Sequence, residues 1–377
     1  MSDTIQRIID LAVQIQQIPA PTFHESKRAA FVRGLFEQEG LKNVGMDEVG
    51  NVYGLLSNVA SIKKSALSRE ISNVKPLVVS AHLDTVFPFE MDLSVRRKNG
   101  LLHGVGIGDN SIGVAALIGL IWLIRERKIE LRGNIWVVAN VCEEGLGDLR
   151  GMKAIVERYG ENVLAYLVLE GMALGHVYHR AVGVKRYRIT VKTRGGHSWS
   201  DYGQLSAIHE LSKLVVQLTS LELPKEPRTT MNVGRISGGT SVNVIAPEAS
   251  LELDLRSEGQ IPLEKLIANV ERIMREAAKP GLQIEAEVVG ARPAGELSPE
   301  HPLILLAEDC VREQGLEAIL TTGSTDANIP LSKGLPALVL GITKGGGAHT
   351  KDEFIRPEHV AQGMEQLVGF LQRAWSA

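Results

Sequence analysis

The segment VKPLVVSAHLDTV (74–86) is a continuous apolar run that closes with a histidine and an aspartate. Three further runs of this kind are NIWVVANVC (134–142), VLAYLVLE (163–170) and PALVLGI (336–342). Short Val- and Leu-rich runs without polar alternation are typical of strands that are buried on both faces. Amphipathic helical patterns lie between them, for example at 111–128. Together they predict an α/β domain of three layers, with a mixed, largely parallel sheet between helices.

A different pattern begins near Gly183. Residues 185–192 and 251–256 alternate apolar and polar side chains, as half-exposed strands do. Two amphipathic helices and two more strands complete the order β-α-β-β-α-β; the helices are at 205–218 and 263–274, and the strands are near 230–237 and 282–290. This order predicts a ferredoxin-like domain at 183–292, inserted into a discontinuous domain made of 1–182 and 293–377.

The composition argues against several classes of partner. The chain has 377 residues, and its 41 Lys and Arg nearly balance its 44 Asp and Glu. It has no basic run of about five to eight residues, so we expect no nucleic-acid partner. No apolar segment reaches the roughly 20 residues of a spanning helix, so we expect no membrane partner. The two cysteines, Cys142 and Cys310, are predicted to be free thiols, which favours a cytoplasmic protein.

Acidic residues and histidines gather where the predicted strands of the first domain end. They are His82 and Asp84, Asp109, Glu143 and Glu144, Glu170, and His349. Because parallel strands end at one edge of a sheet, we expect these side chains to lie close together. Carboxylate and imidazole ligands without thiolates suit zinc in an open catalytic site, or cobalt or manganese. The pattern therefore predicts a metal site at this edge.

The glycine-rich stretch GVGIG (104–108) invites comparison with a nucleotide-binding turn. The third glycine of the dinucleotide fingerprint is missing, because Asp109 and Ser111 stand at the two positions where it would fall. We therefore expect no nucleotide cofactor.

These motifs resemble those of the di-zinc family that contains aminoacylase, glutamate carboxypeptidase, peptidase T, acetylornithine deacetylase and succinyl-diaminopimelate desuccinylase. The resemblance covers essentially the whole chain. It rests on a His-x-Asp after a buried strand, an Asp in a Gly-rich turn, a Glu-Glu pair, a strand-end Glu and a His in a C-terminal Gly-rich loop. The matching residues are His82 and Asp84, Asp109, Glu143 and Glu144, Glu170, and His349. One departure is Ser111, where the family often has Lys.

The resemblance implies a role for each of these residues. Asp109 would bridge two zinc ions, for which cobalt or manganese could substitute. Each ion would take two more ligands, Glu144 with His349 for one and His82 with Glu170 for the other. Asp84 would accept the second ring N–H of His82 and orient it. Glu143 would act as general base on a water that bridges the metals, which would attack the amide carbonyl.

The resemblance also implies that the inserted domain is a lid, which often carries a homodimer interface. Its Gly-Gly-His motif contains His197, which would reach the developing oxyanion from its own subunit or from a partner. Asn243 and Arg256 would bind the substrate carboxylate, since a guanidinium matches a carboxylate with two hydrogen bonds. Alternatively, Arg256 lies on a solvated strand face beside Asp254. Asp326, in the family-like segment GSTDANIP (323–330), would support the site or cap a helix.

We therefore predict a cytoplasmic di-zinc hydrolase that acts on small peptides as a carboxypeptidase-, aminopeptidase- or tripeptidase-like exopeptidase. GSTDANIP resembles peptidase T, whereas Glu170 resembles the carboxypeptidases and deacylases. An N-acyl amino acid deacylase, of the acetylornithine deacetylase or desuccinylase type, is therefore the alternative. A non-catalytic binding protein on the same fold is a third hypothesis. It predicts loss of the bridging Asp, a ligand or the base, and the sequence retains all of them.

Overall fold

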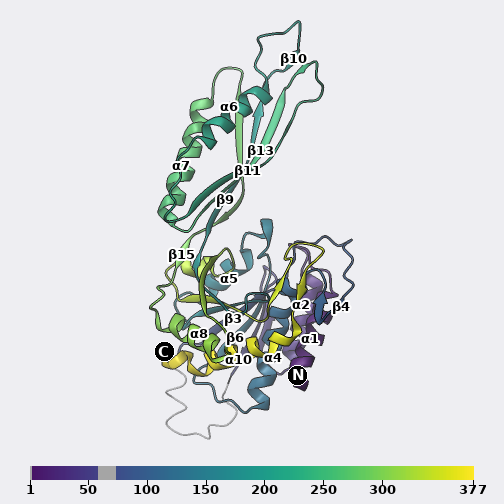
Figure 1. Ribbon diagram of the computed structural model, residues 1–377, viewed down its shortest axis with the longest axis vertical. Helices are drawn as coiled ribbons and strands as arrows, with labels where there is room; N and C mark the ends of the chain where they lie inside the picture. The colour runs from purple at the N-terminus through teal and green to yellow at the C-terminus, as the bar shows by residue number, and fades with distance from the viewer. Residues whose placement is uncertain (1, 58–73) are drawn as a thin grey trace. The chain divides into compact units, whose positions relative to one another are not determined.

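The computed structural model describes residues 2–57 and 74–377. The chain divides into two compact units (Figure 1). Unit 1 consists of Met1–Ala181 and Glu296–Ala377, and unit 2 is Val182–Gly295. Unit 2 begins one residue before the predicted insertion and ends three residues after it.

Unit 1 is built on a mixed sheet of nine strands among its described residues. At the centre, β6 (Ile135–Asn140), β3 (Leu77–His82), β7 (Tyr166–Glu170) and β17 (Ala337–Gly341) lie side by side and run parallel. The flanking strands are β1 (Lys42–Met46), β2 (Val52–Leu56), β8 (His176–Ala181), β15 (Gly295–Glu296) and β16 (Ile319–Gly323). β2 and β8 pair antiparallel with this centre. The predicted mixed, largely parallel sheet is confirmed.

Helices cover both faces of this sheet. Successive residues of a strand point to opposite faces, so they pack into different cores. In β3, Leu77 and Val79 belong to one hydrophobic core, whereas Val78 belongs to another. The first core is covered by α1 (Asp3–Gln16), α2 (Ser26–Gln38), α4 (Ile112–Glu126), α8 (Pro302–Glu313) and α10 (Val360–Arg373). The second is covered by α5 (Arg150–Tyr159) and α9 (Asn328–Ser332). Burial on both faces explains the unbroken apolar runs of the central strands.

Helix α4, with the turn before it (Ile107–Glu126), is the one segment of the described chain that is long and apolar enough to cross a membrane, and at 20 residues it is longer than the sequence-based expectation allowed. Its apolar side chains are buried in the core of unit 1. Both cysteines are buried and free, as predicted.

A small antiparallel sheet in unit 1 brings two glycine-rich segments together. Its strands are β4 (Arg96–Lys98), β5 (Leu101–His103), β18 (Gly345–Gly346) and β19 (Phe354–Ile355). β19 pairs with β5, so the loop between β18 and β19 lies next to the turn that follows β5. His349 is in this loop, and Asp109 is in this turn.

Unit 2, all of whose residues are described, has the predicted β-α-β-β-α-β order. Its main elements are β9 (Gly183–Lys192), α6 (Ala207–Thr219), β11 (Thr229–Gly238), β13 (Glu248–Ser257), α7 (Gln260–Ala277) and β14 (Gln283–Arg292). The antiparallel sheet has the order β11-β13-β9-β14, which is that of a ferredoxin-like fold. Leu251, Leu253 and Leu255 of β13 pack with the two helices in one core. A separate pair of short strands, β10 (Gly196–His197) and β12 (Val244–Ile245), carries His197.

Candidate metal centre

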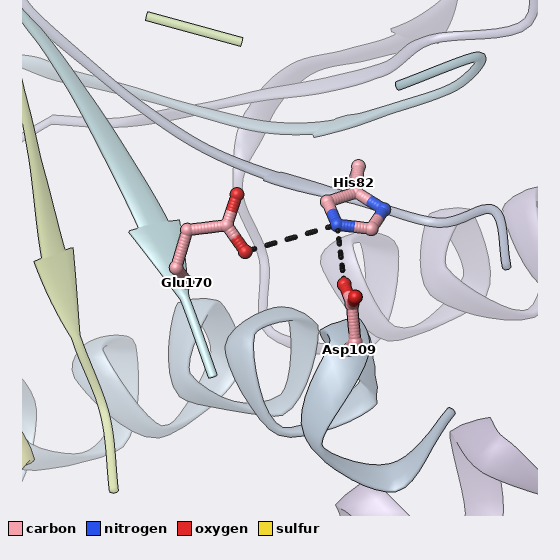
Figure 2. Close-up of side chains that lie close together, drawn as sticks. All are labelled: His82, Asp109 and Glu170. Carbon is pink, nitrogen blue, oxygen red and sulfur yellow. Dashed lines mark ion pairs between the residues drawn. The ribbon is translucent and has the colours of Figure 1, made fainter. Parts of the chain in front are cut away.

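The parallel strands of unit 1 end at one edge of the sheet, and the predicted ligands lie there. His82 is the last residue of β3, and Glu170 is the last residue of β7. Glu143 and Glu144 follow shortly after β6. Figure 2 shows one ring nitrogen of His82 facing the carboxylates of both Glu170 and Asp109, and Asp109 comes from the turn before α4.

Asp109 contacts a different histidine with each of its carboxylate oxygens. Its Oδ1 lies 3.1 Å from Nε2 of His82, and its Oδ2 lies 3.0 Å from Nε2 of His349. Each histidine nitrogen also faces a second carboxylate. His82 lies 3.9 Å from Glu170, and His349 lies 3.1 Å from Glu144. The five predicted ligands thus form two half-sites that share Asp109.

These four distances, from 3.0 to 3.9 Å, lie on either side of the separation between two ligands of one metal ion. Two ligands of one tetrahedral zinc ion, each bonded at about 2.0–2.2 Å, stand roughly 3.3–3.6 Å apart. Ligand atoms of Asp109, Glu144 and His349 all lie within 4.8 Å of one another, as do those of His82, Asp109 and Glu170. The donors are carboxylate oxygens and imidazole nitrogens, which zinc, cobalt and manganese accept. The residues therefore fit two divalent cations.

Burial and the contacts between carboxylates and histidines shift the pKa values of this cluster. Burial alone would raise the pKa of Asp109, but hydrogen bonds from His349 and His82 hold it well below its usual range. Contacts with Asp109 and Glu144 raise the pKa of His349 to about 10. Burial, opposed by His82 and assisted by other carboxylates, raises the pKa of Glu170 to about 8. The cluster thus attracts positive charge, which protons or metal ions can supply.

The backbone of the Glu-Glu segment is held by two buried carboxylates. Asp84 accepts the N–H of Glu143 and that of Glu144, each at 2.9 Å. Glu25 accepts the N–H of the preceding residue, Cys142, at 3.1 Å. Three consecutive N–H groups are therefore fixed, and this orients Glu143, the predicted base. A side-chain oxygen of Glu143 lies within 4.8 Å of ligand atoms of His82 and Glu144.

The contact between His82 and Asp84 differs from the sequence-based expectation. The ring Nδ1 of His82 lies 3.1 Å from the backbone carbonyl of Asp84 and 3.6 Å from its carboxylate. The carbonyl is therefore the closer acceptor for the ring N–H. The carboxylate instead accepts the two backbone N–H groups because the turn after β3 aims it at the Glu-Glu segment. His82 still has its Nε2 directed at the ligands.

Two residues that support the site were not predicted from the sequence. Glu353 accepts the backbone N–H of Asp109 at 2.9 Å, and Asn110 donates to the carbonyl of Leu169, next to Glu170, at 2.8 Å. Each is adjacent or close in sequence to a predicted ligand, which is the only sequence signal they carry. Asp326 is fully buried and accepts a hydrogen bond from Asn140, the last residue of β6, at 2.7 Å. Asp326 therefore supports the edge of the sheet at which the site lies.

The predicted residues of unit 2 lie at two ends of that unit. His197 and Asn243 are exposed. They lie close together, since the N–H of Ser198 donates to the carbonyl of Asn243 at 3.0 Å. Arg256 lies eight residues along β13 from Glu248, the end nearer to Asn243, which is about 26 Å at 3.3 Å per residue. Its Nε donates to Asp254 at 2.7 Å, as the alternative hypothesis for Arg256 describes.

The tautomer of His197 follows from its hydrogen bonds. Its Nδ1 faces the backbone N–H groups of Trp199 and Ser200, at 3.2 and 3.4 Å. A nitrogen that accepts N–H groups carries no proton, so in the neutral ring Nε2 carries it. His197 can therefore donate a hydrogen bond from Nε2 to a ligand.

Comparison with known proteins identifies the family of the chain. The family description Peptidase family M20/M25/M40 matches residues 78–373. Succinyl-diaminopimelate desuccinylase of Corynebacterium glutamicum is 24% identical over 354 residues, covering 92% of this chain and 90% of that protein. A tripeptidase structure from Staphylococcus aureus has a TM-score of 0.83 at 21% identity and covers 99% of both chains. Aminopeptidase PepT from Bacillus cereus has a TM-score of 0.79 at 21% identity, covering 98% of both. The chain therefore belongs to peptidase family M20/M25/M40, whose members include peptidases and deacylases.

Proposed function

We propose that the protein is a di-zinc exopeptidase that hydrolyses an amide bond of small peptides. The observation that carries this proposal is the arrangement around Asp109, whose two oxygens face two histidines that each have a second carboxylate. A shared carboxylate of this kind suits two cations held a few ångströms apart. Two bound ions would polarise the scissile carbonyl and lower the pKa of the attacking water.

The residues of the chain supply the remaining requirements. Asp109 would be shared, with Glu144 and His349 on one ion and His82 and Glu170 on the other. Glu143 would accept a proton from the attacking water at its side-chain oxygen and then give it to the leaving amine. Its buried position, between the two half-sites, supports this role, because burial excludes competing water.

Unit 2 would supply substrate contacts. The Nε2 proton of His197 supports a role as donor to the oxyanion that forms at the carbonyl. Asn243 and Arg256 would bind the substrate carboxylate. Because Arg256 lies at the end of β13 that is farther from Asn243, a small substrate can meet both only if they come from two copies of the chain. This separation supports a homodimer formed through unit 2.

A deacylase of N-acyl amino acids is the second candidate. The desuccinylase of Corynebacterium glutamicum aligns over most of this chain and favours this activity. The reaction would use the same residues, since it also breaks an amide bond. Only the group that is accepted on the acyl side differs.

An assay of the zinc-loaded protein separates these candidates. We expect turnover of dipeptides or tripeptides and none of N-acetyl or N-succinyl amino acids. The reverse result would replace the exopeptidase with the deacylase. Two bound zinc ions with no turnover of either class would favour the non-catalytic binding protein.

The two buried free thiols support our proposal that the enzyme works in the cytoplasm.

A further inference from the structure

We infer that Glu353 is a positioning residue that holds Asp109 in place between the two half-sites. This inference rests on the proposed metal centre but not on the identity of the substrate. Glu353 is fully buried. It acts on the backbone of the turn that carries Asp109.

Both oxygens of Glu353 are directed at this turn. Oε2 accepts the N–H of Gly106 at 2.8 Å. Oε1 accepts the N–H of Gly108 at 2.8 Å and that of Asp109 at 2.9 Å. The backbone carbonyl of Glu353 accepts a fourth N–H, from Gly104, at 3.0 Å. One residue therefore binds the turn from 104 to 109 along its length.

The glycines make this convergence possible. Gly106 has a φ of 70°, a left-handed conformation that side-chain-bearing residues rarely adopt. A Cβ on Gly108 would lie 2.5 Å from the sulfur of Met172, so the side chain of Met172 would have to move. The turn can thus fold closely around a single carboxylate.

Glu353 also connects the turn to the loop that carries His349. The loop between β18 and β19 presents His349 to the carboxylate of Asp109 and Glu353 to its backbone N–H. Within this loop, the N–H of Glu353 donates to the carbonyl of Thr350 at 3.4 Å. A displacement of Glu353 would therefore move Asp109 relative to His349, and with it the shared ligand.

A carboxylate is the group that this arrangement requires. Hydrogen bonds from N–H groups to a charged oxygen are stronger than those to a neutral one. In Glu353→Gln, one of the two oxygens becomes an NH2 group, which cannot accept. At least one buried N–H of Gly106, Gly108 or Asp109 would then lose its partner, which is unfavourable. The turn would relax to avoid this, and Asp109 would shift.

The test makes two measurements on E353Q. Titration calorimetry gives its affinity for zinc, and the visible spectrum of the cobalt-loaded protein reports the geometry of the ligands. We expect E353Q to bind its ions about 10–100-fold more weakly, the usual scale for a residue that orients a ligand. The cobalt spectrum should change, because it reports the geometry of the ligands. E353D keeps the charge but is one methylene shorter, so its affinity should lie between those of E353Q and the wild type.

Two control variants separate positioning from general stability. E358Q changes an exposed glutamate five residues on, whose partner is Arg356 at 3.5 Å, and should bind metal like the wild type. Y53F removes a buried hydroxyl that donates to Asp47 at 2.7 Å, elsewhere in unit 1. It should lower the melting temperature without changing the cobalt spectrum.

Wild-type zinc affinity and an unchanged cobalt spectrum in E353Q would overturn the inference. If E353Q does not fold, the same result in E353D would overturn it. A wild-type protein that binds two ions without cleaving peptides would refute the exopeptidase, yet weaker binding by E353Q would still support the role of Glu353.

Discussion

The functional side chains of unit 1 and unit 2 are held in different ways. In unit 1, His82, Glu143 and Glu144 are buried, and carboxylates from distant segments hold their backbone or ring. In unit 2, His197 is exposed; its backbone N–H donates to Asp201 at 2.7 Å, and its two-residue strand pairs with β12. Buried groups in a fixed arrangement can stabilise charge strongly, because little solvent competes with them. We therefore expect unit 1 to perform the chemistry and unit 2 to orient the substrate.

Glu143→Gln should have the largest effect on turnover. The amide cannot accept a proton, so kcat should fall by roughly 10³–10⁴-fold, near the upper end of general base catalysis. Zinc content should remain two ions per chain, because Glu143 is not a proposed ligand. Steady-state kinetics together with metal analysis test this. Glu144→Gln is the matched variant, and it should lose an ion. Full activity in E143Q would show that another group takes the proton.

His197→Ala should have the next largest effect, and it tests the role of unit 2. Loss of an oxyanion donor typically lowers kcat by about 10²–10³-fold. Metal affinity should not change, because no proposed ligand lies in unit 2. The control is His209→Ala, an exposed histidine on α6. If H197A retains the wild-type rate, His197 plays no part in the reaction.

Arg256→Ala should weaken substrate binding more than it slows the reaction. Loss of a hydrogen bond to a charged group costs about 1.5–3 kcal/mol, which corresponds to a KM roughly 10–100-fold higher. Arg256→Lys should recover part of this, since it keeps the charge but not the two-pronged geometry. An unchanged KM in R256A would favour the alternative, in which Arg256 only pairs with Asp254 on the strand surface.

The smallest expected effect is a pH dependence of stability, and it is confined to unit 1. Without metal, the folded protein holds protons that the unfolded chain releases, because the pKa of His349 rises from 6.5 to about 10 and that of Glu170 from 4.5 to about 8. Its stability should therefore fall as the pH rises from about 5 to 10. Metal ions replace these protons, so stabilisation by zinc should grow with pH.

Thermal unfolding with zinc or with EDTA between pH 6 and 8.5 measures this difference. H349A should show a smaller increase, since it removes one of the raised pKa values together with a proposed ligand of one ion. A zinc-induced rise in melting temperature that is constant or decreases with pH would contradict the proposed exchange of protons for metal.

The ligands and most of the central strands could be predicted from the apolar runs and the polar residues at their ends. His82 and Glu170 end buried strands, and such positions meet at one edge of a parallel sheet. Other elements carried weaker signals. α2 was not predicted, because its buried face includes a charged residue, Arg28. That guanidinium is buried only because it donates to backbone carbonyls such as that of Leu83, at 2.7 Å.

The supporting contacts of the site could not be predicted. Glu353 and Gly106 are 247 residues apart, and Asn140 and Asp326 are 186 residues apart. No local pattern encodes such a pair, since each depends on how two distant loops meet. The same reasoning applies to Asp84, whose carboxylate was expected on the ring of His82 and instead accepts backbone N–H groups from the segment after β6.

By itself, the sequence determined the fold class, the insertion of a second domain and the kinds of ligand available, because hydrophobic periodicity and strand-end chemistry are local properties. Only the tertiary structure decided that Asp109 lies between two histidines, that Glu353 binds its turn, and that Asn243 and Arg256 are far apart on unit 2. These features depend on the register of strands and the meeting of loops, which are set by packing across the whole chain.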